Sequence, residues 1–341
     1  MPPAPPRPLP QRAVLIVGTL LLAAVASLLV AGMTGSIAVA LSELPDALGQ
    51  VLRGQPDSLA ASLLELRAGR ALTAFVTGGA LALAGVMMQA LLRNPLADPY
   101  ILGISSGASV GALLALLLMC ASTTVDAAAL GGAVTVSMLL YWFARRDMRG
   151  GAAAEGGAST LLLTGVILSS ACIALVTLML SIAPEGRLRS MVFWMIGDLA
   201  GAPLRPLPWI VLAASLVYAL RSARAMNVVA LHADAASTLG IRVGALRKGL
   251  FFVSGLLTAS AVTSAGSIGF VGLIIPHACR FAFGPDHRVL IPAAVLGGGG
   301  FLVLCDTLAR TVIAPTQLPV GAVTALIGAP VFLYQLHHLR K

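Results

Sequence analysis

The stretch Gly266–Arg288, GSIGFVGLIIPHACRFAFGPDHR, contains the features that decide the fold. Its first half is apolar and glycine-spaced, which suits a helix that packs closely against other helices in lipid. Its last dozen residues contain two histidines, two arginines and an aspartate. His277 and His287 are ten residues apart with no further ligand at metal-site spacing, so the pattern argues against a metal centre. We interpret this stretch as a membrane segment that ends in a structured exit into water.

The composition of the whole chain supports a lipid environment. Of the 341 residues, 58% are hydrophobic and 10% are charged, whereas a soluble domain carries about 25% charged residues. The apolar runs are continuous, which favours helices over the alternating strands of an outer-membrane barrel. The sequence therefore predicts an all-α, polytopic integral membrane protein.

The apolar runs divide the chain into about ten predicted spans, each close to the ~20 residues that cross a bilayer. Gly266 and Gly269 lie inside the region 249–283, which forms either one bent helix or two short ones. Residues 1–12 are rich in proline and are expected to be a disordered cytoplasmic segment, and 13–341 are expected to form a single transmembrane domain. The predicted spans are 13–32, 68–92, 100–120, 126–144, 159–182, 206–220, 249–265, 268–283, 289–309 and 318–336.

The basic residues predict the orientation. With both termini in the cytoplasm, seven of the 22 basic residues lie outside and 22 − 7 = 15 lie inside, as the positive-inside rule requires. The net charge of +9 does not indicate nucleic-acid binding, because no basic patch with interleaved aromatic residues is present.

Several kinds of chemistry are missing from the sequence. The two lysines, Lys248 and Lys341, do not stand in a GxxxxGK[ST] loop, so the chain is not expected to hydrolyse nucleotides. The four cysteines lie in or beside apolar runs without a CxxC spacing and are expected to be buried hydrophobic residues. We expect Asp306 and Arg310 to neutralise each other as an i, i+4 pair. No cofactor, metal or enzymatic activity is predicted, and a transporter or channel is favoured.

Glycines spaced by four residues indicate close helix packing. The segment GISSGASVG places Gly103, Gly107 and Gly111 on one stripe of a helix. Small residues in such a stripe let two backbones approach closely.

Five further segments carry a family resemblance. Together they resemble the FecCD-type permeases, the membrane subunits of ATP-binding-cassette (ABC) importers for ferric siderophores, haem and vitamin B12. The resemblance covers nearly the whole chain from about residue 60. The segments are LLRNPLADPYILGISSGASVGALLAL (91–116), FWMIGDLAG (193–201), LHADAASTLGIRV (231–243), GSIGFVGLIIPHACRFAFGPDHRVLIP (266–292) and LPVGAVTALIGAPVFLYQL (318–336).

The resemblance implies a type II ABC importer permease fold of ten helices in the inner membrane. It also implies four kinds of partner: a second copy of the chain, two separate ABC ATPase subunits that use the ATP, a periplasmic binding protein and the lipid bilayer. The absence of a P-loop is consistent with this arrangement.

The resemblance assigns a coupling loop to about 221–248, where short helices of the family dock into the ATPase. The residues implied are Asp234, Ala235, Ala236, Leu239 and Gly240. The family usually has glycine where this chain has His232. A plain connecting loop is the alternative interpretation.

The resemblance also implies a docking site for the binding protein, formed by Arg67, Arg70 and Arg310. A guanidinium fork suits capture of a carboxylate across an interface, although each arginine could instead simply snorkel to the membrane surface. Gln317 stands where the family usually has glutamate before Leu-Pro. Residues 187–201 are expected to contain a short helix near the outer gate.

A cytoplasmic gate is implied for Asn94 and Leu96, which follow the second span, together with Ser159. A pure turn at Asn94 is the alternative, because Pro95 cannot continue a helix.

Two other functions remain as alternatives. A secondary transporter driven by an ion gradient would need interrupted helices and ion-binding oxygens near mid-membrane, and the sequence offers few buried acids. A structural membrane scaffold is the weaker alternative. The sequence does not distinguish siderophore, haem and cobalamin as cargo, and iron chelates are preferred only as the commonest substrates of the family.

Overall fold

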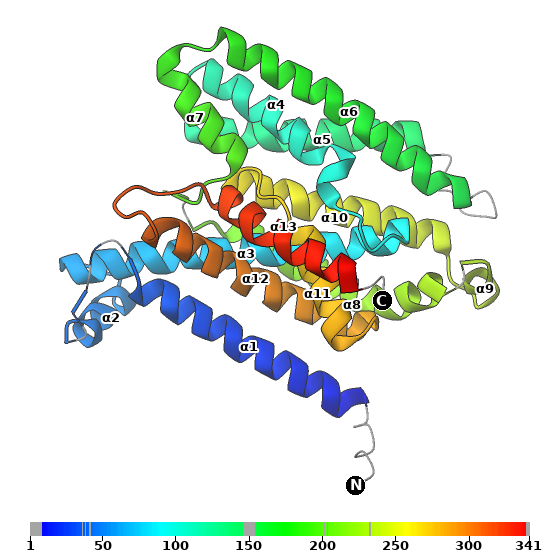
Figure 1. The fold of residues 1–341 in the computed structure, drawn as a ribbon, viewed down its shortest axis with the longest axis horizontal. Helices are drawn as coiled ribbons and strands as arrows, with labels where there is room; N and C mark the ends of the chain where they lie inside the picture. Colours follow the sequence, from blue (N-terminus) through cyan, green and yellow to red (C-terminus); the bar gives the residue numbers. More distant parts are fainter. Residues whose placement is uncertain are drawn as a thin grey trace.

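The computed structural model describes residues 9–35, 37, 39–40, 42–145, 154–200, 202, 204–231 and 233–338. Within these residues every regular element is a helix (Figure 1). The elements in chain order are α1 Leu9–Met33, α2 Leu44–Leu52, α3 Leu59–Leu92, the 3₁₀ turn η1 Pro99–Leu102, α4 Ile104–Leu117, α5 Ser122–Ala144, α6 Ala154–Ile182, α7 Glu185–Ile196, α8 Pro206–Leu231, α9 Ala233–Thr238, α10 Val243–Ala265, α11 Val271–Phe283, α12 His287–Thr311 and α13 Val320–His338.

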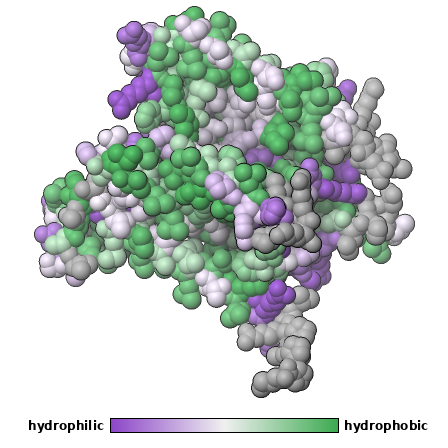
Figure 2. All heavy atoms as spheres, in the orientation of Figure 1, coloured by the Kyte–Doolittle hydropathy of each residue, from purple (hydrophilic) through white to green (hydrophobic). Residues whose placement is uncertain are grey.

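The described helices confirm the predicted number of spans. Seven are long and apolar enough to cross a membrane, and three shorter apolar helices, α4, α11 and α13, bring the total to 7 + 3 = 10. Each lies on one of the ten predicted apolar runs. Hydrophobic residues cover most of the face drawn in Figure 2, while hydrophilic residues collect near the ends of the helices.

The helices define two ends of the bundle, which we call the α2 end and the α9 end. Figure 1 shows them at the left and the right of the view. Helix α1 starts and α13 finishes toward the α9 end, whereas α3 starts at the α2 end. Helix α1 begins at Leu9, so residues 9–12 are helical where the sequence predicted a disordered segment. Residues 1–8 lie outside the described part of the chain.

Helix α3 is the centre of the bundle. It packs against α12, α10, α11, α8 and α1, and nearly all of its residues from 71 to 92 are buried. It begins at Leu59, before the predicted start at 68, because Ser58 caps it: the Ser58 hydroxyl accepts a 3.1 Å hydrogen bond from the Ala61 N–H. Its 34 residues span about 51 Å, more than the ~30 Å hydrocarbon core, so its first turns extend beyond the lipid.

Glycines allow the backbones of neighbouring helices to touch α3. A Cβ atom added to Gly78 would lie 2.2 Å from the carbonyl oxygen of Gly298 in α12. One added to Gly85 would lie 1.8 Å from the carbonyl oxygen of Gly272 in α11. Both distances are far below van der Waals contact, so no residue with a side chain fits at these positions without moving a helix.

The region 249–283 is two helices. Helix α10 ends at Ala265 and α11 begins at Val271, with Phe270 at a positive φ of 71°. The connection contacts η1 and α4, where the Ser267 and Ser105 hydroxyls lie 2.9 Å apart and the Ile268 N–H donates to the Tyr100 hydroxyl at 3.1 Å. Irregular backbone inside a membrane protein requires such internal partners.

The three glycines of the predicted stripe contact two different helices, α6 and α5. Gly103 caps α4, and a Cβ there would lie 2.9 Å from the Ser169 hydroxyl of α6. Gly107 and Gly111 face α5, where added Cβ atoms would lie 2.6 Å from the Gly132 carbonyl and 1.9 Å from the Ala128 carbonyl.

Adjacent glycines in α5 provide a matched test of this packing. A Cβ atom added to Gly132 would lie 2.1 Å from the Gly107 carbonyl oxygen. A Cβ atom added to Gly131 would meet nothing within 4 Å. We expect Gly132→Ala to lower the free energy of unfolding by about 1–3 kcal/mol, the usual cost of overpacking. Gly131→Ala should be neutral or slightly stabilising because alanine favours helix. Thermal unfolding of both variants in detergent measures this, and equal melting temperatures would contradict the backbone contact.

Candidate functional site

A buried carboxylate at the α2 end joins two of the predicted docking arginines. Asp306 of α12 is only 2% exposed. Arg70 of α3 approaches it side-on, with Nη2 2.8 Å from Oδ1 and Nε 2.9 Å from Oδ2. This two-point geometry is the strong form of an arginine–carboxylate contact. The remaining Nη1 of Arg70 donates to Gln317 Oε1 at 2.9 Å, so Gln317 keeps a polar contact here without a charge.

Asp306 pairs with both Arg70 and Arg310. The predicted i, i+4 ion pair is present, with Arg310 Nε 3.8 Å from Asp306 Oδ2. Arg70 makes the shorter contact to the same carboxylate, at 2.8 Å. Sequence spacing could not reveal a partner on α3, which lies 236 residues away.

Arg67 and Arg310 also hold the end of α1. Both side chains are buried, and they donate to backbone carbonyls that an α-helix leaves unpaired at its C-terminus. Arg310 Nη1 donates to the Thr34 carbonyl at 2.7 Å and Nη2 to the Ala31 carbonyl. Arg67 donates to the carbonyls of Met33 and Ile37. Positive charge at a helix C-terminus also complements the helix dipole.

The three predicted docking arginines thus lie together, each with internal partners. With Asp306 they form a group that we call the arginine cluster, whose net charge is 3 − 1 = +2. Arg70 is the most exposed of the three, at 13% of its side chain.

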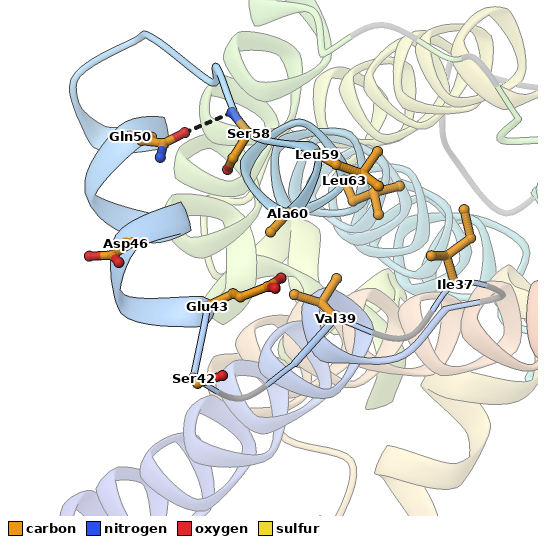
Figure 3. Close-up of a pocket in the computed structure, with 10 residues that line it drawn as sticks. All are labelled: Ile37, Val39, Ser42, Glu43, Asp46, Gln50, Ser58, Leu59, Ala60 and Leu63. Atoms are coloured by element: carbon orange, nitrogen blue, oxygen red, sulfur yellow. Dashed lines mark hydrogen bonds between the residues drawn. The ribbon is translucent and has the colours of Figure 1, made fainter.

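A pocket beside the arginine cluster was not predicted from the sequence. It has a volume of about 440 Å³ and lies between α2, the chain before it and the first turn of α3. Gln50 fixes this arrangement by accepting a 2.9 Å hydrogen bond from the Ser58 N–H. In Figure 3 Glu43 points across the opening toward Val39 and Ala60, whereas Asp46 points away from it. Among the described residues, no group of three or more His, Cys, Asp or Glu side chains is placed to hold a metal ion.

The predicted coupling residues lie on or beside α9. Helix α8 continues to Leu231, beyond its predicted end at 220, and α10 begins at Val243. The connection is therefore shorter than 221–248, because the added turns of α8 bury Ala223 and Met226 against the bundle. The backbones of Asp234 and Ala235 belong to α9, while their side chains and residue 232 lie outside the described part of the chain.

Helix α9 ends in a glycine cap. The Ile241 N–H donates to the Ala236 carbonyl at 3.0 Å, and Gly240 has a positive φ of 79°, as in the common left-handed C-cap. Ala236 is buried, whereas Leu239 is 69% exposed. The cap thus presents an apolar side chain at the surface of the α9 end.

The predicted gate residues also lie near this end. The Asn94 side-chain oxygen accepts a 2.9 Å hydrogen bond from the Leu96 N–H, which closes a turn directly after α3. Leu96 and Ser159 are exposed. The turn accounts for the geometry of Asn94, and the gate remains a prediction.

The ten apolar helices in the described part of the chain, seven of them long enough to cross a membrane, are typical of a multi-span membrane protein. The chain belongs to the FecCD transport family, whose profile matches residues 19–338.

Relatives of known class cover most of the chain. YvrB of Bacillus subtilis, an uncharacterized ABC transporter permease, is 39% identical over 274 residues, 79% of this chain and 77% of the relative. The cobalamin import system permease BtuC of Halobacterium salinarum is 37% identical over 287 residues, 83% of this chain and 75% of the relative. The hemin transport system permease HmuU of Yersinia pestis is 35% identical over 285 residues, 82% and 84% of the two chains.

A solved structure agrees with this family. It is an inward-facing transporter assigned to the metal-chelate ABC type, and it matches with a TM-score of 0.82 at 30% sequence identity. The match covers 95% of this chain and 99% of the other. The predicted fold of an ABC importer permease is therefore confirmed.

The arginine cluster yields a double-mutant test. Arg70→Met leaves the buried Asp306 carboxylate without its close partner, which typically costs about 3–5 kcal/mol of stability. Removing both charges with Arg70→Met and Asp306→Leu should cost less than the sum of the single changes, because neither charge is then left buried alone. Arg53→Met, at an exposed arginine of the same end, is the control and should change little.

Thermal unfolding of the isolated chain measures this internal role without any partner protein. Strictly additive losses in the double variant would contradict the pairing.

Proposed function

We propose that the chain is the transmembrane permease subunit of an ABC importer that carries a metal chelate inward, as a ferric siderophore, haem or cobalamin. The observation that carries the proposal is the 35–39% identity to ABC permeases over about four fifths of the chain, including cobalamin and hemin permeases. The match to an inward-facing transporter assigned to the metal-chelate type supports the same class of cargo.

The energy comes from separate ATPase subunits in this proposal. The sequence has no GxxxxGK[ST] loop, so it offers no site that would cradle the phosphates of ATP. Helix α9, its glycine cap and the exposed Leu239 form a short projection at one end of the bundle. We assign this projection, with Asp234, Ala235 and Ala236, to the ATPase contact.

The α9 end faces the cytoplasm in this assignment. By the positive-inside rule the side with more arginine and lysine is cytoplasmic. In the described part of the chain the α9 end has ten such residues, Arg12, Arg93, Arg145, Arg221, Arg224, Arg242, Arg247, Lys248, Arg280 and Arg288. The α2 end has seven, Arg53, Arg67, Arg70, Arg187, Arg189, Arg205 and Arg310. Both termini then belong to the cytoplasmic side of the inner membrane.

A periplasmic binding protein would dock at the α2 end. The +2 charge of the arginine cluster attracts acidic side chains over several ångströms, which favours encounter and register more than raw affinity. Arg70, Arg67 and Arg310 contribute to this field, although their direct hydrogen bonds are internal.

A second copy of the chain would complete the cargo path. Helix α6 is long and apolar, but much of its surface is exposed in the single chain. A cargo of chelate size needs a wide passage, which two copies can line together. Asn94, Leu96 and Ser159, at the cytoplasmic end in this assignment, would then form its gate. ATP binding would move α9 and shift the passage between outward and inward access.

One observation favours an ion-driven secondary transporter as the second candidate. The interruption between α10 and α11 resembles the broken helices at which such proteins bind ions. Its polar partners, however, include the hydroxyls of Ser105, Tyr100 and Thr324. Asp98, the carboxylate nearest to them in sequence, accepts the Tyr100 N–H at 2.8 Å and caps η1. The interruption is therefore satisfied internally.

Affinity purification of the tagged chain from its native membranes tests the proposal. We expect an ABC ATPase to co-purify with the wild type. Leu239→Asp should lose it, because a charge replaces the exposed apolar residue of the α9 projection. Leu52→Asp makes the same change at a 78% exposed leucine of the α2 end and should retain the ATPase.

Recovery of the chain without any ATPase, with uptake that follows an imposed proton gradient, would establish the second candidate instead.

A further inference from the structure

Asn227 of α8 joins two residues at the start of α12. Its side-chain N–H donates to Asp286 Oδ1 at 2.7 Å. Its side-chain oxygen accepts from the His287 backbone N–H at 2.9 Å and lies 2.7 Å from His287 Nδ1. Arg288 completes the group, with Nη2 2.8 Å from Asp286 Oδ2. We call Asn227, Asp286, His287 and Arg288 the α8–α12 pin.

The ionised state of Asp286 determines which way the Asn227 amide points and which nitrogen of His287 carries the proton. The hydrogen bonds from Arg288 lower the pKa of Asp286 to about 2, so this carboxylate is ionised at neutral pH and can only accept. The amide N–H of Asn227 must therefore face Asp286, which leaves its oxygen facing His287. That oxygen can only accept, so His287 carries its proton on Nδ1. The Nδ1 atom of His287 is thereby paired, whereas its Nε2 atom is buried without a hydrogen-bond partner in the described part of the chain.

The pin also caps α12. The first N–H groups of a helix have no partner within the helix. Asp286 accepts the Arg288 N–H at 3.0 Å, and Asn227 accepts the His287 N–H from another helix. Hydrogen bonds that involve a charged group are stronger than those between neutral groups, so the bond from Asn227 to Asp286 links α8 to α12.

The position of the pin relates it to α9. Asn227 lies one turn before the end of α8, and α9 starts two residues after that end. Helix α12 packs against α3, α1, α11, α8 and α13 and carries Asp306 and Arg310 near its other end. The pin is thus a polar contact, added to the packing of α8 on α12, between the base of the α9 projection and a helix that reaches the arginine cluster.

We propose that Asn227 is a positioning residue that fixes the α8–α9 connection to the first turn of α12, so that α12 moves when an ATPase displaces α9. This inference rests on the proposed function. It concerns the transmission of motion within the permease.

Exchange of the two side chains tests the proposal. Asn227→Asp places two carboxylates together and should break the pin. Asp286→Asn alone keeps an oxygen that accepts from Asn227 and is the matched control. The double exchange, Asn227→Asp with Asp286→Asn, restores a donor facing an acceptor between the two helices and leaves an acceptor for His287. It loses the cap on the Arg288 N–H, because Asp286 Oδ1 accepts from both Asn227 and Arg288.

The measurement is uptake per ATP hydrolysed by the permease–ATPase–binding-protein complex in liposomes. The probe is labelled cobalamin, haem or ferric siderophore, whichever the wild type takes up. We expect Asn227→Asp to lower uptake per ATP at least tenfold and Asp286→Asn to lower it less than threefold. The double exchange should raise it at least threefold above Asn227→Asp. Loss of the ATPase from Asn227→Asp alone, with recovery in the double exchange, would support the proposal equally, because α9 is then displaced.

The outcomes distinguish a failure of the pin from a failure of the proposed function. Wild-type uptake per ATP in Asn227→Asp, or a double exchange no better than that variant, would overturn the role of the pin and leave the proposed function intact. A wild-type complex without ATP-driven uptake would overturn both.

Discussion

The close backbone contact of α3 with its neighbours is the constraint on which the rest of the structure depends. In lipid, apolar side chains gain nothing by leaving the solvent, so helices associate through van der Waals packing and polar contacts. Gly78 against Gly298 and Gly85 against Gly272 bring α12 and α11 directly onto α3. This contact fixes how far along α3 the two helices lie. It thereby sets Asp306 opposite Arg70 at one end of the bundle.

Polar side chains hold the helices together at the two ends of the bundle, as the glycine contacts do in its middle. Arg67 and Arg310 satisfy the unpaired carbonyls of α1 and attach that helix to the bundle. At the other end Asn227 and Asp286 satisfy the unpaired N–H groups of α12. Each cluster meets a requirement that any helix end in or near lipid imposes. Each also joins elements that are distant in the sequence.

Much of this architecture could be predicted from the sequence, for reasons that lie in single segments. Span length and continuous apolar runs locate all ten helices, and the motifs around residues 91–116 and 266–292 identify the family. Contacts between distant segments were beyond such reasoning. Asp306 lies four residues from Arg310, yet its closer partner is Arg70. Asn227 has no local signal, because its partners follow about 60 residues later. The short helix α2 and the extra turns of α8 were missed because neither is a long apolar run.

The central claim is that this chain is a membrane passage whose energy comes from another subunit. Reconstitution of the purified chain into vesicles, with and without its ATPase and binding protein, tests it most directly. The account predicts uphill accumulation of labelled chelate only when both partners and ATP are present, and none when a proton or sodium gradient is imposed on the chain alone. Uphill accumulation by the chain alone under either gradient would contradict the account.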